Sequence, residues 1–129
     1  MDQQDQLMQD ALVEAYRHTR ELQSLCTAAG ASFSAGHDSE AMEQLRHILD
    51  GIGFIAQAIH LTSEAQRARG IAIDLTGLPG VLEPVVEALE NRDFGALGDL
   101  VHYEIEPILG DWEERLEGLT SAPTTSVQA

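Results

Sequence analysis

Hydrophobic side chains recur at helical spacing along four parts of the chain. In the first part, from Asp2 to Ala29, apolar or small residues step by four and three positions, which predicts a long amphipathic helix that ends at Gly30. The positions of this stripe are Met8, Leu12, Ala15, Thr19, Leu22, Cys26 and Ala29. The next stretch, GASFSAGHDS, contains two glycines and several small polar residues, so we expect a loop there.

The second helix is expected over about Ser39 to Thr62, and it carries two apolar stripes. One stripe comprises Ala41, Leu45, Ile48, Ile52, Ile55 and Ile59. The other comprises His47, Gly51, Phe54, Ala58 and Leu61. At about 100° per residue, the two stripes lie well over about 100° apart around the helix. One face can join the core of the protein, and the other needs a second explanation.

A broken helical connection is expected between residues 63 and 80. Ser63 can cap a short helix there, but two glycines before Pro79 and one after it interrupt the pattern. The positions expected to face inward are Ala65, Ala68, Ala72 and Leu75.

A third long helix ends near Asn91 and is marked by its apolar positions. These are Leu82, Val85, Val86 and Leu89. Pro84 is compatible with this helix if it lies in the first turn, where a backbone N–H is not needed. Asp93 can cap the following helix. Because the link between them is so short, the two helices should form an antiparallel hairpin.

The last helix is expected from Phe94 to Leu119. Its apolar side comprises Leu97, Val101, Ile105, Ile108, Leu109, Trp112, Leu116 and Leu119. Pro107 removes a backbone donor and frees the carbonyl of Tyr103, so we expect a bend in the helix. Trp112 should anchor the core or an interface. Glu104 lies close to the edge of the apolar side, where it should reach water, an arginine or a capping amide.

These elements predict an all-α fold, an antiparallel four-helix bundle with a broken helical connection between the second and third helices. Residues 1–119 would form a single domain. Residues 120–129 have no hydrophobic periodicity, so we expect a disordered tail.

The charge of the chain limits its possible partners. It has 22 acidic and 7 basic side chains, which gives a formal net charge of -15. Phosphate backbones and anionic lipids would be repelled, so neither nucleic acid nor a membrane surface is an expected partner. The lone cysteine, Cys26, is expected to be a buried packing thiol, and it can form no intramolecular disulfide. With no signal sequence or long apolar run, a cytoplasmic location is expected.

His102 raises the question of a metal or acid/base site, because acidic residues surround it in the stretch DLVHYEIEPILGDW. Helical rotation places Asp99, Glu106, Glu113 and Glu117 on a stripe opposite the core, with His102 near its edge. A solvated acidic face is therefore expected. Asp99 and His102 have the Glu-x-x-His-like interval of metal-binding bundles, but they point outward, so we expect no metal ligands and no cofactor.

The spacing of His47 and Gly51 resembles the phosphohistidine helix of histidine phosphotransfer domains, which are also four-helix bundles. In those domains a lysine between the two residues helps to hold the phosphate. Here Asp50 stands in that place, and a carboxylate has the wrong charge for a phosphoryl group. Phosphotransfer through His47 and metal binding within the bundle are the alternatives to an interaction function. In a structural interpretation, Gly51 and Gly53 would let another helix approach closely.

Two stretches, LRHILDGIGFIAQAIHLT and EALENRDFGALGDLVHYEIEPILGDWEE, resemble a family of small, uncharacterised bacterial all-helical proteins. Members of this family show an Ala-Leu-Glu, Asp, Leu, Asp-Leu, Tyr-Glu, Pro and Trp pattern near the C-terminus. The matching residues are Ala88, Leu89, Glu90, Asp93, Leu97, Asp99, Leu100, Tyr103, Glu104, Pro107 and Trp112. The resemblance implies a helical bacterial protein and no particular activity. Tyr103, Glu104, Pro107 and Trp112 are expected to have structural roles.

No nucleophile elbow, phosphate loop or metal quartet occurs in the sequence, so an enzyme is not expected. We expect a protein–protein interaction module, of the adaptor or export-chaperone kind. Its surface would be the second stripe, from His47 to Leu61, and it would form a homodimer or accept an amphipathic helix of a partner. In the opposing interpretation, the second helix is central and the other helices cover both of its faces.

Overall fold

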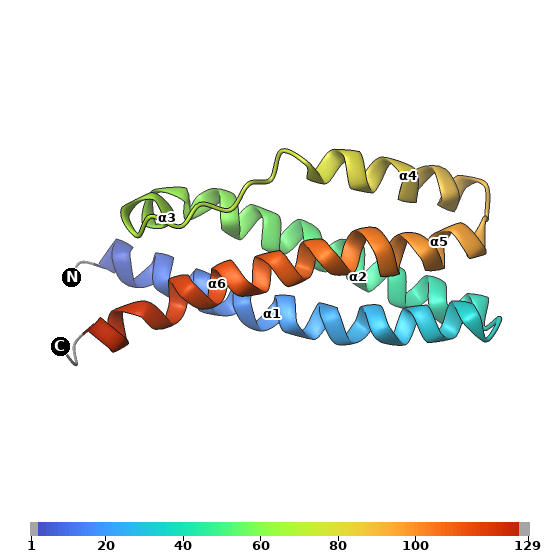
Figure 1. Cartoon of the computed structure of the whole chain (residues 1–129), viewed down its shortest axis with the longest axis horizontal. Helices are drawn as coiled ribbons and strands as arrows, with labels where there is room; N and C mark the ends of the chain where they lie inside the picture. The colour runs from blue at the N-terminus through green and yellow to red at the C-terminus, as the bar shows by residue number, and fades with distance from the viewer. Residues whose placement is uncertain (1–2, 127–129) are drawn as a thin grey trace.

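The structure, a computed structural model, describes residues 3–126, with side chains described as far as residue 121. In chain order the elements are α1 (Gln3–Ser34), α2 (Asp38–Leu61), α3 (Ser63–Ala68), α4 (Leu78–Glu90), α5 (Phe94–Leu100), the π-helix η1 (Val101–Ile105) and α6 (Glu106–Ser126). The described part of the chain contains no strand, which confirms the all-α class. The long helices lie side by side, and consecutive ones run in alternating directions (Figure 1).

The helix α1 continues beyond Gly30, so the predicted loop is much shorter than expected. The buried stripe also continues, to Ser32, and this packing outweighs the cost of about 1 kcal/mol for one glycine inside a helix. The helix ends instead at Ser34, and Gly36, two residues later, has a φ of 79°. The His37 N–H donates to the Ser32 carbonyl at 2.9 Å, and the Gly36 N–H to the Phe33 carbonyl at 3.2 Å, as in a Schellman C-cap.

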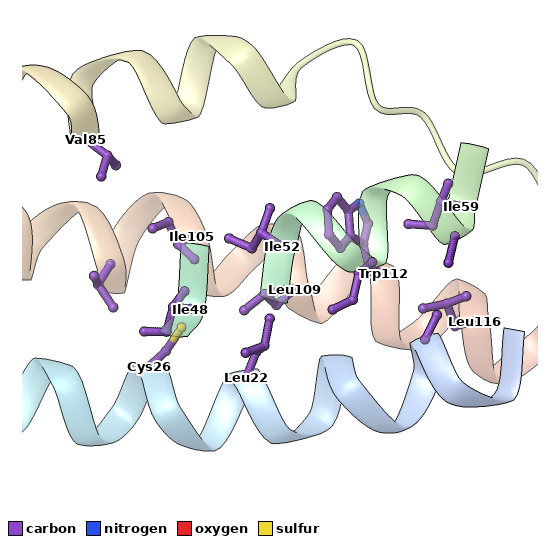
Figure 2. Close-up of a cluster of buried hydrophobic side chains, with 14 of the residues drawn as sticks. Leu22, Cys26, Ile48, Ile52, Ile59, Val85, Ile105, Leu109, Trp112 and Leu116 are labelled. Carbon is purple, nitrogen blue, oxygen red and sulfur yellow. The ribbon is translucent and has the colours of Figure 1, made fainter. Parts of the chain in front are cut away.

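The first apolar stripe of α2 lies in the core, as predicted. In Figure 2, Ile48 and Ile52 lie near Cys26 and Leu22 of α1 and Leu109 of α6. Val85 of α4 belongs to the same buried cluster. All six residues of the stripe are buried. The regular spacing of four, three, four, three and four residues is therefore explained by one continuous core face.

The connection after α2 is held by a buried polar side chain, Gln66. Its Nε2 donates to the Ile59 carbonyl at 2.6 Å, and its Oε1 accepts from the Ile73 N–H at 3.0 Å. The predicted short helix is present as α3, but the expected inward positions are wrong for Ala68 and Ala72, which are exposed. Gln66 lies inward instead, because unpaired backbone groups at this turn need a partner.

The helix α4 begins at Leu78, four residues earlier than its first predicted apolar position. Pro79 lies at the start of the helix, where its missing N–H leaves no bond unmade. Pro84 consequently lies inside the helix rather than in its first turn, which corrects the prediction. After the link, the Asp93 side chain accepts from the Ala96 N–H at 3.1 Å, so the predicted N-cap is confirmed.

The last long helix contains a π-helical turn, η1, directly before Pro107. The Glu106 N–H donates to the carbonyl of Val101, five residues earlier, instead of the usual four. The turn replaces the simple bend that was expected at Pro107. At the other end, α6 continues from Leu119 to Ser126, so this part of the predicted tail is helical. Residues 127–129 lie outside the described residues.

Candidate functional site

The second stripe of α2 lies on the outer side of the molecule, along its boundary with α1. Phe54 is 48% exposed and Leu61 is 65% exposed, so the protein's own helices do not cover them. His47 is also exposed, and Gly51 is half-buried. Ala58 is the exception, because it is buried. The stripe therefore provides an exposed apolar surface, with Ala58 as part of its floor.

The helix α1 completes this surface with residues that the sequence analysis did not include. His18 contacts Phe54, with ring centroids 4.9 Å apart and planes inclined by 59°. Nearer the start of α1, Leu7 is 62% exposed and lines the same hollow as Leu61. A single sequence shows which residues share one helix face, but it does not show which neighbouring helix lies beside that face.

Two hollows follow the boundary between the helices, and both are lined by Phe54. The larger has a volume of about 670 Å³ and lies beside Gly51. The smaller has a volume of about 460 Å³ and extends toward Leu61. We call this surface the α1–α2 groove. Its large apolar residues are Leu7, Leu22, Leu25, Phe54 and Leu61.

Gly51 allows α1 and α2 to approach each other closely beneath the groove. A Cβ atom at this position would lie 2.7 Å from Cδ1 and 2.8 Å from Cδ2 of Leu22. These distances are shorter than van der Waals contact, so no larger residue fits without moving Leu22. A Cβ atom at Gly53 would have no atom of another part of the chain within 4 Å. The predicted close approach of another helix is therefore found at Gly51 and is wrong for Gly53.

Carboxylates line both walls of the groove. They are Asp10, Glu14, Glu21 and Asp50. The nearest guanidinium groups already pair with acidic residues: Arg17 with Glu14 and Glu21, and Arg46 with Glu43 and Asp50. All of these ion pairs are exposed and contribute little to stability. Because each arginine is shared between two carboxylates, the groove keeps a surplus of negative charge around an apolar floor.

His47 stands beside the carboxylates of Glu43 and Asp50, which also bind the nearest guanidinium group, that of Arg46. The Nε2 of His47 lies 3.4 Å from Oε2 of Glu43, and Asp50 lines the same hollow. Arg46 donates to Glu43 at 2.6 Å and lowers the pKa of that carboxyl through this hydrogen bond and its charge. The carboxyl therefore stays ionised next to His47. Such surroundings oppose a phosphoryl group, which needs neutralising positive charge.

A separate hollow, of about 610 Å³, lies between the end of α1 and the α5–η1 segment. His102 Nδ1 lies 2.9 Å from Oε1 of Glu106, and the rings of His102 and Tyr103 meet edge to face, 4.5 Å apart. Burial raises the pKa of the Cys26 thiol to about 12, with a smaller effect from Glu106. The lining cysteine therefore remains protonated and unreactive at neutral pH.

The acidic stripe predicted opposite the core is only partly correct. Asp99 and Glu117 are exposed, but Glu106 and Glu113 are half-buried. Glu113 pairs with Arg20 of α1 across the helix boundary, at 3.5 Å. The reason is the π-helix η1, which lies between Asp99 and Glu106 and rotates the later residues relative to the earlier ones.

The residues of structural interest in the last helix have different environments. Trp112 is 2% exposed and belongs to the core (Figure 2). Tyr103 is 66% exposed, Glu104 is exposed, and so is Pro107. Glu104 therefore reaches solvent, which is one of the three environments expected for it.

Residues 5–115 match the family model of a domain of unknown function, DUF8042. This match spans most of the chain. The protein belongs to the DUF8042 family. The prediction of a family without an assigned function is thereby confirmed. The search of curated proteins and the search of solved structures each find no match.

Two further findings concern this DUF8042 protein as a whole. Among the residues with described side chains, no group of three or more His, Cys, Asp or Glu residues is arranged to hold a metal ion. No helix in the described part of the chain is long and apolar enough to cross a membrane. The candidate functional site is the α1–α2 groove, where Phe54 and Leu61 are exposed.

Proposed function

We propose that this protein is a non-enzymatic interaction module, an adaptor or export-chaperone-like protein, that docks another polypeptide in its α1–α2 groove. The supporting observation is the exposure of Phe54 and Leu61 over two adjoining hollows. Soluble proteins seldom leave such apolar residues together on a grooved surface unless something covers them. We further propose an antiparallel four-helix bundle acting in a bacterial cytoplasm.

Covering the groove would contribute favourable free energy to association. Leu7, Phe54 and Leu61 each keep about half or more of their surface exposed. Burial of such a side chain contributes on the order of 1 kcal/mol or more. The occupant is either a second copy of the chain or an amphipathic helix of a partner, because both present an apolar face of the right kind.

Site-specific photocrosslinking in cells of the source organism tests this function. A photoreactive phenylalanine analogue replaces Phe54 in one variant and Val86 in another. Val86 is a matched control, since it is 49% exposed but lies on α4, away from the groove. We expect crosslinked adducts of a defined mass from position 54 and not from position 86. Equal yields from the two positions, or none from position 54, would contradict the proposal.

A further inference from the structure

We infer that the occupant of the α1–α2 groove is a basic amphipathic helix of a different protein. The inference rests on the docking function proposed above and adds the chemistry of the partner. Three observations carry it: the length of the groove, the position of its apolar residues, and the sign of the charge on its walls.

The groove has the length and shape for one helix. It extends along α2 from His47 to Leu61, which at 1.5 Å per residue corresponds to about 21 Å, the length of a helix of about 14 residues. Apolar contact points lie at both ends and in the middle: Leu25 near one end, Phe54 in the centre, and Leu7 with Leu61 at the other end. Anchors at i, i+3 or i+4, i+7 and i+11 of an entering helix would meet them.

The walls of the groove select for positive charge on the entering helix. Glu14 and Glu21 lie on the α1 side, and Asp50 on the α2 side, so both flanks of an inserted helix would face carboxylates. The two guanidinium groups nearby, on Arg17 and Arg46, are each shared between two acidic residues. Lysine or arginine residues beside the apolar anchors of a partner would balance the remaining negative charge.

The same charges act against a second copy of this chain. A symmetric dimer would place the same patch of both subunits face to face. The carboxylates of one groove would then meet those of the other, and each chain carries a formal net charge of -15. Like charges brought together in an interface oppose association, so of the two occupants the different protein is favoured.

A peptide-binding experiment with the full-length protein tests the inference. The probe is a fluorescent peptide of about 14 residues with leucine at the anchor positions and lysine on both flanks. A second peptide carries glutamate in place of every lysine. A third has the composition of the first with its helical periodicity scrambled. Binding is measured by anisotropy, at low and at physiological ionic strength.

The wild type should bind the basic peptide, more tightly at low ionic strength, and should bind the acidic and scrambled peptides far more weakly. Phe54→Glu should weaken binding of the basic peptide by about tenfold or more, whereas Val86→Glu should change it less than about twofold. In a variant with both Glu21→Lys and Asp50→Lys, the preference should shift toward the acidic peptide. Both of those side chains are exposed, so the exchange should leave the fold intact.

Several results would overturn the inference. Equal binding of the basic and acidic peptides would show that wall charge does not select the partner. Equal binding of the basic and scrambled peptides would show attraction by charge alone. Dimerisation of the wild type that Phe54→Glu abolishes would make a second copy the occupant, while the docking function would stand. If the basic peptide does not bind, the inference fails, and the crosslinking yield from position 54 then shows whether the docking function fails with it.

Discussion

Gly51 and Leu22 set the distance between α1 and α2, because the side chain of Leu22 occupies the space where a Cβ of residue 51 would stand. Leu22 is itself buried, so it cannot swing out to water. The groove thus lies over a close contact between the two helices. A leucine of the same chain therefore fills the space beside Gly51.

The first prediction compares two glycines of α2. Gly51→Ala should lower the free energy of unfolding by about 1 kcal/mol, since overpacking against Leu22 costs about 1–3 kcal/mol and better helix propensity returns about 1 kcal/mol. Gly53→Ala should raise it by about 0.5–1 kcal/mol, because nothing lies within 4 Å of its added methyl group. Urea denaturation followed by circular dichroism measures both values. Shifts of the same sign in the two variants would contradict this packing.

The second prediction compares a glutamine whose side-chain oxygen is hydrogen-bonded, Gln66, with one whose buried side-chain oxygen has no partner among the described residues, Gln44. Gln66→Leu should lower the free energy of unfolding by about 1–3 kcal/mol, because the Ile73 N–H loses its acceptor in a buried position. The control is Gln44→Leu. Oε1 of Gln44 is buried and has no hydrogen-bond partner among the described residues, so this change should be neutral or stabilising. If both variants lose equal stability in urea, hydrogen bonding by Gln66 is not the cause.

Much of the helical pattern could be predicted from the sequence, because a regular core stripe is visible in it. The buried face of α2 is an example, since no other influence disturbs its spacing. The end of α1 was harder to predict. Gly30 and Gly36 are the same residue type six positions apart, and tertiary contacts of Ser32 and Phe33 decided between them. The sequence alone contains no record of those contacts.

The π-helix is reflected in the spacing of the buried residues around it. From Leu97 to Leu109 the buried residues Leu97, Val101, Ile105 and Leu109 step by four three times in succession. In an ordinary α-helix each such step moves about 40° beyond a full turn, so three steps would carry the stripe off the core. A wider turn restores the alignment. The same reasoning would have placed Glu106 and Glu113 nearer to α1.

The candidate site was predicted in part. Phe54 and Leu61 were named from their spacing and are exposed as a docking surface requires. Leu7 and His18 were not named, since their role depends on α1 lying beside this face of α2. The acidic walls were equally hidden, because Asp10 and Asp50 are far apart in the sequence and line one groove only in the folded chain.

The third prediction concerns the reactivity of Cys26. Burial raises the pKa of its thiol from an ordinary value of 9.0 to about 12, so the folded protein should react with a thiol reagent at pH 8 only as fast as it unfolds. In denaturant the reaction should be rapid. Fast labelling of the native protein would show that the thiol is accessible.

The raised pKa of Cys26 also predicts a dependence of stability on pH. Above about pH 9 the thiol ionises in the unfolded chain but stays protonated in the folded one, so the free energy of unfolding should fall as the pH rises toward about 12. Cys26→Ala keeps both tyrosines but lacks the thiol, and it should show a smaller fall over this window. Identical slopes for the wild type and Cys26→Ala would contradict the shift.

The last prediction concerns Arg92, a non-glycine residue with a positive φ two positions after the end of α4. Its φ is 52°, and the Asp93 N–H donates to the Ala88 carbonyl at 2.9 Å, the same kind of cap that Gly36 provides after α1. A side chain with a Cβ is strained in this left-handed conformation by about 1–2 kcal/mol. Arg92→Gly should therefore raise the free energy of unfolding by about 0.5–1 kcal/mol, after the greater freedom of glycine in the unfolded chain is subtracted.

Arg92→Ala separates backbone strain from charge. It removes the same guanidinium group but keeps a Cβ, so the strain of the positive φ persists and no gain in stability is expected. The two variants should therefore differ in their urea midpoints, with the glycine variant the more stable. A gain of equal size in both would mean that removal of the guanidinium group, and not relief of the backbone, stabilises the turn between α4 and α5.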